Sequence, residues 1–188
     1  MRLTEKVHQY LKPKLQSGNT AIDATAGNGH DTLFLAQCVG ETGEVFAFDV
    51  QQQALASAKQ HLQAHAIQTP ITWIHAGHED MLKHIPIDKH KHIQVITFNL
   101  GYLPHGDKHI TTQAEHTLMA LNASLSLLAQ GGIVSILAYT GHAGGREECE
   151  AIKVWANSLG DNYCVSITMP ANTKSSPPEW ICIQKKLA

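Results

Sequence analysis

The stretch TAIDATAGNGHDT, residues 20–32, decides the fold class. It begins with a short apolar strand at 20–23, turns at Gly27 and Gly29, and continues into a helical pattern at about 31–39. Glycine lets the backbone turn sharply and approach a ligand without interference from a Cβ atom. A strand, a glycine-bearing turn and a helix in this order predict the first unit of an α/β fold that binds a ligand at the turn.

The same alternation of strands and helices extends outward to both ends of the chain. Further strands are predicted at 45–49, 71–75, 93–99 and 133–138, with helical patterns between them. Two final apolar runs, 163–169 and 180–184, are expected to pair antiparallel. We therefore predict a Rossmann-like, doubly wound seven-stranded sheet, mostly parallel, with an antiparallel C-terminal hairpin. It forms a single domain over residues 1–188, in which 1–17 are an N-terminal helix preceding the core.

The helix before the fifth strand carries its own start and stop signals. Thr112 to Glu115 matches a capping box, which predicts that the helix begins there. Its buried stripe is expected to consist of Leu118, Leu121, Leu125 and Leu128. The pair Gly131-Gly132 is expected to end this helix and to open the next strand.

Composition excludes several classes of protein. The chain has 188 residues, of which 43% are hydrophobic and 16% charged, with a formal net charge of −2. It therefore has enough apolar residues for a core and is not a polycationic nucleic-acid binder. No apolar run approaches the roughly 20 residues of a membrane span, and the N-terminus lacks the apolar stretch of a secretory signal.

Cysteines and histidines give no metal signal. The four cysteines, Cys38, Cys149, Cys164 and Cys182, form no CxxC pair and are expected to be reduced and mostly buried. Histidines crowd residues 84–92, which we interpret as a solvated loop before a strand. We predict a cytoplasmic protein without a metal site.

Polar residues follow the first three strands where ligands bind in such sheets. Asp23 stands just before the turn formed by Gly27, Asn28 and Gly29. A carboxylate there suits a ligand with a positive group, such as the α-ammonium of S-adenosylmethionine. Asp49 ends the second strand, where a carboxylate can accept both ribose hydroxyls.

Further contacts are predicted close to Asp49 and after the third strand. Gln51 lies near the same pocket, and His78 and Glu79 can contact an adenine. A nicotinamide dinucleotide site is the first rival, because it uses the same ribose carboxylate. Its fingerprint asks for glycine or alanine at position 32, where this chain has Thr32.

The end of the fourth strand predicts the acceptor site. Residues 99–104, NLGYLP, resemble the Asn/Asp-Pro-Pro-Tyr loop of adenosylmethionine-dependent enzymes that methylate exocyclic amines, with Leu100-Gly101 replacing both prolines. Asn99 would orient the amine, and alignment supplies much of the catalysis in such a displacement. Asp107 and His142 are candidates for positioning or deprotonating it, since histidine exchanges protons near neutral pH.

Taken together, residues 23–32, 49–51, 99–108 and 139–145 resemble the MnmM (YtqB-like) class I tRNA methyltransferases. The resemblance runs from about residue 18 to the C-terminus and includes Asn172 and Pro177-Pro178. It implies a fold that binds S-adenosylmethionine and methylates the aminomethyl group of 5-aminomethyl-2-thiouridine at the tRNA wobble position. The product would be 5-methylaminomethyl-2-thiouridine.

The tRNA anticodon stem-loop is the partner that this resemblance implies. The expected substrate contacts are Tyr102, Lys108, Tyr139, Arg146 and Asn172, with the tyrosines placed to stack on a base. A homodimer that completes the tRNA surface is a further hypothesis. Methylation of rRNA or of a small amine stays open as an alternative, as do a non-catalytic nucleotide-binding module and a NAD-dependent oxidoreductase.

Overall fold

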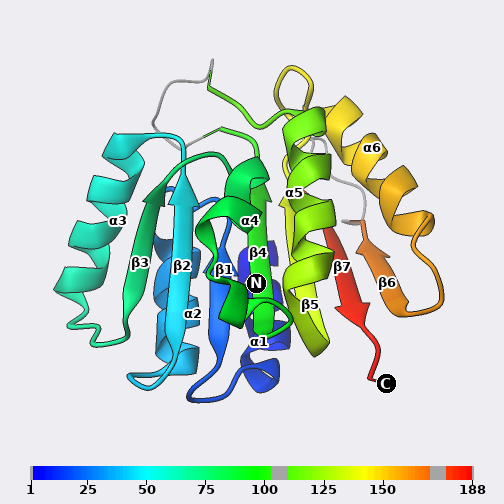
Figure 1. Cartoon of the computed structure of the whole chain (residues 1–188). Coiled ribbons are helices and arrows are strands. Elements are labelled where there is room, and N and C mark those ends of the chain that lie inside the picture. Colours follow the sequence, from blue (N-terminus) through cyan, green and yellow to red (C-terminus); the bar gives the residue numbers. More distant parts are fainter. Residues whose placement is uncertain (1, 103–109, 170–176, 188) are drawn as a thin grey trace.

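A computed structural model describes residues 2–102, 110–169 and 177–187 of the chain. Its centre is a seven-stranded sheet in the order β3-β2-β1-β4-β5-β7-β6 (Figure 1). The strands are β1 (Thr20–Asp23), β2 (Glu44–Asp49), β3 (Ile71–His75), β4 (Ile93–Leu100), β5 (Leu128–Ala138), β6 (Tyr163–Thr168) and β7 (Glu179–Lys185). The first five pair parallel, and β7 pairs antiparallel with both β5 and β6. The predicted sheet and its C-terminal hairpin are confirmed.

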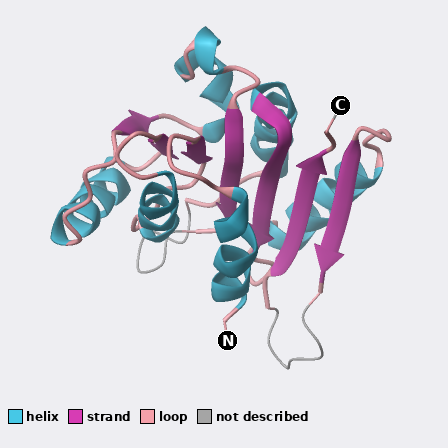
Figure 2. Cartoon of the chain, turned by 90° about the horizontal axis from the view of Figure 1, so that it is seen from below, coloured by secondary structure: helices cyan, strands magenta, loops and turns pink. Residues whose placement is uncertain are grey.

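Helices cover both faces of the sheet (Figure 2). They are α1 (Leu3–Leu11), α2 (His30–Val39), α3 (Gln52–Ala64), α4 (Met81–His84), α5 (Ala114–Leu127) and α6 (Gly145–Asn157). Short 3-10 turns lie at η1 (Lys12–Lys14), η2 (His78–Asp80) and η3 (Ile87–Lys89). The described structure therefore has three layers, with the sheet in the middle.

Alternation along the strands divides the core between the two faces. In β1, Ala21 packs in the cluster formed with α1 and α2, whereas its neighbour Ile22 packs in the cluster formed with α4, α5 and α6. Both residues are fully buried, because successive strand side chains point to opposite faces and both faces are covered by helices. This burial fixes the register of β1 and with it the position of the turn that follows.

The start of α5 differs from the prediction. Its N-cap is Gln113, and no side chain caps it. The Thr112 hydroxyl instead donates to Glu148 Oε2 of α6 at 2.7 Å. The capping box is wrong at this position because a buried carboxylate on a neighbouring helix takes the hydroxyl that would have capped α5.

The boundary between α5 and β5 is also different. Leu128 is the first residue of β5, so it does not belong to the helix, and Gly131 and Gly132 lie within the strand. Pairing with β4 skips from Ile93↔Leu128 to Val95↔Ile133, which leaves the glycines in a bulge. Gly131 has φ +75°, a conformation that favours glycine.

The remaining expectations concern cysteines, histidines and membrane spans. Cys149 and Cys182 are buried and Cys38 is partly buried, but Cys164 is exposed on the edge strand β6, because alternate residues of that strand face solvent. Residues 84–92 run from the end of α4 through η3 to β4. In the described ranges, no group of histidine, cysteine or acidic side chains is arranged to hold a metal ion, and no helix has the length and apolar character to cross a membrane.

Candidate active site

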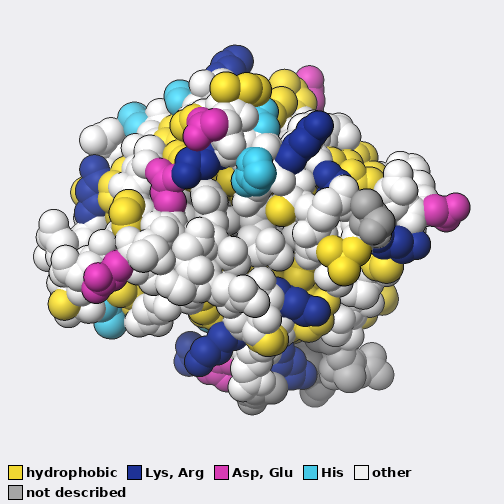
Figure 3. Space-filling view, turned by 60° about the horizontal axis from the view of Figure 1, so that its bottom comes forward, with side chains coloured by type: hydrophobic (Ala, Val, Ile, Leu, Met, Phe, Trp, Pro, Cys, Tyr) yellow, Lys and Arg dark blue, Asp and Glu magenta, His cyan; other side chains and the backbone are white. Residues whose placement is uncertain are grey.

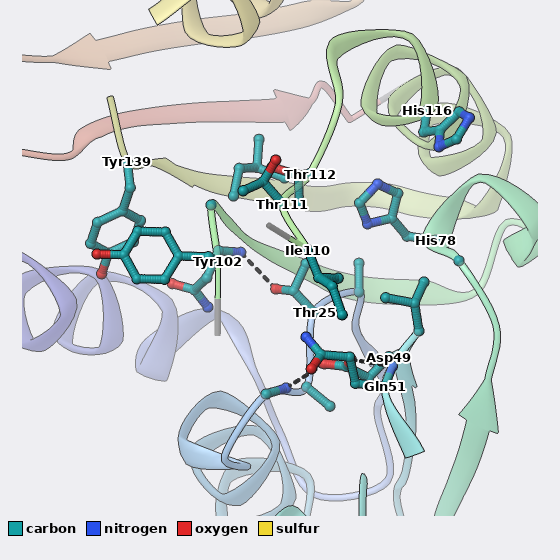
Figure 4. Close-up of a pocket in the computed structure, with 18 of the residues that line it drawn as sticks. Thr25, Asp49, Gln51, His78, Tyr102, Ile110, Thr111, Thr112, His116 and Tyr139 are labelled. Atoms are coloured by element: carbon teal, nitrogen blue, oxygen red, sulfur yellow. Dashed lines mark hydrogen bonds between the residues drawn. The ribbon is translucent and has the colours of Figure 1, made fainter. Parts of the chain in front are cut away.

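A cavity of about 780 Å³ opens at the carboxyl ends of the parallel strands (Figure 4). This size suits a ligand with the dimensions of a nucleoside derivative. Residues at or after the ends of β1, β2 and β3 form one wall, which we call the cofactor half. Residues after β4 and β5, together with Ile110–Gln113, form the other wall, which we call the acceptor half.

The glycine turn in the cofactor half is held by Asp49. The Gly27 N–H donates to Asp49 Oδ2 at 2.9 Å, and the Gln51 N–H donates to Asp49 Oδ1 at 2.8 Å. Gly27, Asn28, Asp49 and Gln51 all line the cavity, as the sequence predicts for a cofactor site. Burial raises the pKa of Asp49, while these two backbone donors oppose that rise. Its carboxylate is therefore fixed in orientation at the edge of the cavity.

Gly29 has a different reason to be glycine. It caps α2 with φ +82°, and a Cβ at this position would lie 2.9 Å from the Ala58 Cβ of α3. Gly29 does not line the cavity. Close packing of α2 against α3, rather than approach to a ligand, explains the residue.

Asp23 lies beneath the cavity and does not line it. It is fully buried, accepts a hydrogen bond from the Thr32 hydroxyl at 2.6 Å, and accepts another from the Thr25 N–H at 3.2 Å. Burial, together with the negative charge of Asp31, raises the pKa of Asp23 to about 7. In this structure Asp23 supports the glycine turn from behind, and Thr32, which the sequence marked against a dinucleotide fingerprint, is its partner.

An imidazole and a carboxylate, those of His78 and Glu79, follow β3 in the cofactor half. His78 is buried with its ring edge against Phe98, and burial lowers its pKa, which favours the neutral imidazole. Glu79 lies beside it and pairs with His116 of α5 at 3.5 Å. Figure 4 shows His78 and His116 on the same side of the cavity. His78 and Glu79 both line the cavity, and their contact with an adenine stays a prediction.

Asn99 is held in the acceptor half by Thr25, which follows β1, and by Asp31 in the first turn of α2. Its backbone N–H donates to Thr25 Oγ1 at 2.7 Å, and its side-chain Nδ2 donates to Asp31 Oδ2, also at 2.7 Å. Asn99, Thr25 and Asp31 all line the cavity. These bonds tie the ends of β1 and β4 together across 68 or more residues of chain.

Two tyrosines and a histidine complete the acceptor half. Tyr102 and Tyr139 lie at one end of the cavity in Figure 4, and the Tyr102 ring stands edge-on to His142 at a centroid distance of 6.1 Å. His142 Nδ1 lies 3.1 Å from the Ala143 carbonyl oxygen. Its Nε2 is buried, and within the described part of the chain it has no hydrogen-bond partner. In the tautomer in which Nδ1 donates to that oxygen, Nε2 carries the lone pair.

The structure does not bring four of the predicted residues to the described cavity lining. Asp107, Lys108 and Asn172 fall outside the described residues. Arg146 is exposed in the first turn of α6 and does not line the cavity. It stands one residue after Gly145, where any Cβ would lie 2.7 Å from His142 Cε1, so this turn packs against the histidine.

Several cavity residues carried no predicted role. Thr25 and Asp31 lie in the stretch 20–32, on either side of the glycine turn. The sequence therefore predicted where they lie in the fold but not their function. His116 and the segment Ile110–Gln113 enter from α5 and the residues before it. Their placement depends on the Tyr102↔Thr111 bridge and on the buried Glu148, neither of which leaves a local pattern.

A family described as "Putative rRNA methylase" matches residues 45–184. The chain is 37% identical over 178 residues to the chloroplastic tRNA (mnm(5)s(2)U34)-methyltransferase of Arabidopsis thaliana, covering 89% of this chain and 64% of that protein. The chain thus spans less than two thirds of that relative's length. A crystal structure described as that of a "putative rRNA-methylase" from Clostridium thermocellum superposes with a TM-score of 0.92 at 37% identity, covering 98% of each chain. A crystal structure of a protein from Streptococcus mutans, described as "a putative methyltransferase" in complex with SAH, superposes with a TM-score of 0.86 at 34% identity, also over 98% of each chain.

Proposed function

The chain belongs to the rRNA methylase family, and from that premise we propose that it is an S-adenosylmethionine-dependent N-methyltransferase. The observation that carries the proposal is the cavity itself. It joins a carboxylate clamp at Asp49 to an amide-bearing strand end at Asn99 in one space of about 780 Å³. The relative from Streptococcus mutans was crystallised with SAH, which supports the same cofactor here.

In this proposal the cofactor half holds the nucleoside. Asp49 accepts hydrogen bonds from ribose hydroxyls, with Gln51 beside it, and the turn at Gly27 and Asn28 lets the backbone approach the ligand. His78 and Glu79 contact the adenine. Asp23 acts indirectly, through Thr32 and Thr25, by keeping the turn in place. When bound, the cofactor supplies a methyl group on a sulfonium.

The acceptor half orients the nucleophile. Asn99 accepts a hydrogen bond from the substrate amine and so directs the nitrogen lone pair at the methyl group. The new N–C bond forms as the S–C bond breaks. An alkylammonium must first lose a proton, and His142 Nε2, which has no hydrogen-bond partner among the described residues, is proposed to accept it, with Asp107 as the second predicted residue for this step.

The proposed substrate is the 5-aminomethyl-2-thiouridine of a tRNA wobble position, and the product is 5-methylaminomethyl-2-thiouridine. The name of the Arabidopsis relative supports this choice. Tyr102 and Tyr139 offer a stacking slot for the flipped base. Lys108, Arg146 and Asn172 are proposed to contact the anticodon stem-loop.

With a formal net charge of −2, the chain has no overall positive charge with which to attract RNA. On the face seen in Figure 3, Lys and Arg side chains are scattered among acidic and apolar ones and form no single basic patch. We therefore keep a homodimer as the arrangement that would assemble a larger tRNA surface. Monomeric behaviour in light scattering at micromolar concentration would contradict it.

Two measurements test the proposal at its two levels. SAH is expected to raise the melting temperature, because a ligand that binds the folded state stabilises it, whereas NAD is expected to leave it unchanged. Labelled methyl transfer from S-adenosylmethionine into tRNA from cells lacking the gene is expected to place the label on 5-aminomethyl-2-thiouridine. Label on another nucleoside would show that the proposed substrate is wrong. Stabilisation by NAD instead of SAH would show that the proposed enzyme class is wrong.

A further inference from the structure

Asp31 joins three elements of the fold at the edge of the cavity. It lies in the first turn of α2, and its two carboxylate oxygens have different partners. Oδ2 accepts from Asn99 Nδ2 of β4 at 2.7 Å, while Oδ1 lies 2.6 Å from His8 Nε2 of α1. The Asp31 side chain is 11% exposed, so water competes little for either bond.

The carboxylate determines which way the Asn99 amide faces. The Asn99 amide nitrogen points to Asp31 and donates to its Oδ2 at 2.7 Å, because a carboxylate oxygen accepts hydrogen bonds. The amide oxygen is then the atom that Asn99 can offer to a substrate N–H. With the reverse orientation, the amide N–H would donate to the amine lone pair and so keep that lone pair from attacking the methyl group.

His8 keeps the carboxylate in place from the opposite side. Its ring stacks on Phe34 of α2, with centroids 4.0 Å apart and an angle of 3° between the planes. This contact fixes the ring, and Nε2 then faces Asp31. The N-terminal helix α1 is thereby connected to the acceptor site, although His8 itself does not line the cavity.

We propose that Asp31 is a positioning residue that sets the orientation of the Asn99 amide, and that His8 holds Asp31 for this task. The inference rests on the proposed function, in which Asn99 accepts a hydrogen bond from the substrate amine. It assigns a catalytic purpose to α1, which precedes the sheet in the chain. It also explains why the residue opposite Asn99 carries a carboxyl group.

Exchanging the two residues tests the proposal. Asn99→Asp alone places two carboxylates against each other, and we expect kcat for methyl transfer to fall by about 100-fold or more. The double variant Asp31→Asn with Asn99→Asp restores an amide-to-carboxylate hydrogen bond and leaves a carboxylate oxygen for the amine. It is expected to recover kcat by about tenfold or more over Asn99→Asp, as coupled residues do.

The pH profile gives a readout that a merely structural role would not change. Among the described residues, the titratable groups that act on Asp31 are His8 from α1, Asp23 from β1 and Tyr139 after β5. In Asn99→Asp, one proton shared by the facing carboxylates removes their repulsion, so its kcat should fall relative to wild type as the pH rises. The double variant should lose this added pH dependence. A double variant no more active than Asn99→Asp, with wild-type melting, would overturn the proposal.

His8 is tested with a matched pair on α1. His8→Phe keeps an aromatic ring on Phe34 and removes the nitrogen, so kcat is expected to fall about 3- to 10-fold with little change in affinity for SAH. Gln9→Ala, at an exposed neighbouring position, should leave kcat unchanged. Equal kcat in His8→Phe and wild type would remove His8 from the role.

Neutron diffraction from the wild-type protein reads the amide orientation without any variant or substrate. The expected result is deuterium on the Asn99 atom that faces Asp31 and none on that carboxylate oxygen. A protonated Asp31 donating to the Asn99 oxygen would overturn the proposal even if methyl transfer to tRNA is found. If the deuterium positions are as expected but no methyl transfer is found, the proposed function alone would be contradicted.

Discussion

The two halves of the cavity are held by different kinds of bonds. In the cofactor half, Asp49 is fixed by backbone N–H groups of Gly27 and Gln51, and Gln51 is only two residues away in the chain. In the acceptor half, the bonds that fix Asn99 and Thr112 reach side chains that are distant in sequence. Asn99 bonds to Asp31 across 68 residues and Thr112 to Glu148 across 36. A backbone donor survives substitution of its residue, whereas a side-chain partner does not.

This comparison predicts that the cofactor half tolerates substitution better and that the acceptor half depends on pairs. Glu148 illustrates the second case, since it is 2% exposed and accepts from both Thr112 and Thr117. Through Thr112 it holds the segment that forms part of the cavity wall. The distinction would be sharper if variants of the cofactor half lost affinity for SAH while variants of the acceptor half lost turnover.

The largest expected effect is on stability, at Asp23 beneath the cofactor half. Its pKa of about 7 in the folded protein lies above the ordinary value of about 4 in an unfolded chain. Below about pH 4 the proton on Asp23 makes its full contribution to the stability of the folded protein. As the pH rises from about 4 to about 7, the free energy of unfolding falls by up to roughly 1.4 kcal/mol per pH unit. Asp23→Asn does not titrate and should show a flatter profile in urea unfolding. Equal slopes for both proteins would contradict the assignment.

The next effect separates turnover from binding. Asn99→Ala removes the oxygen that orients the amine and is expected to lower kcat for methyl transfer by about 100-fold or more. Because Asn99 lies in the acceptor half, affinity for SAH measured by calorimetry should stay within about twofold of wild type. Near-normal turnover would show that the amine is oriented by other groups.

Asp49→Ala tests the opposite half. It removes a carboxylate proposed to accept the ribose hydroxyls, and charge-assisted hydrogen bonds contribute about 1.5–3 kcal/mol. Calorimetry should therefore show SAH binding about 10- to 100-fold more weakly. Unchanged affinity would take Asp49 out of the ribose role and leave it as the clamp of the glycine turn.

The smallest of these effects tests the side-chain support of the acceptor half. Thr117→Val keeps the shape of the side chain and removes one of the two hydroxyls that donate to Glu148. The free energy of unfolding is expected to fall by about 1–2 kcal/mol, because the carboxylate is buried. Thr168→Val, on an exposed position of β6, is the matched control and should change it by less than about 0.5 kcal/mol.

Local patterns predicted most of the fold and much of the cofactor half. Residues 20–32 predicted the strand, turn and helix that the structure contains, and the resemblance to a methyltransferase family is confirmed by the comparisons. Gly27, Asn28, Asp49 and Gln51 could be placed at the cavity because strand ends follow directly from apolar runs.

The failures arose where one residue had competing partners. Thr112 fitted a capping box, but Glu148 of α6 takes its hydroxyl. Asp23 preceded the turn as a ligand residue would, yet its side chain points under the turn to Thr32. The pairing of Asp31 with His8 and Asn99 requires three elements to be in place, so no spacing in the sequence could have indicated it.

The division of the cavity into two halves is tested most directly by a crystal structure of this protein with SAH. The account predicts ribose hydroxyls on Asp49, the adenine beside His78, and the sulfur at the boundary of the halves, facing Asn99. SAH bound with its ribose away from Asp49, or with its sulfur turned away from Asn99, would contradict it.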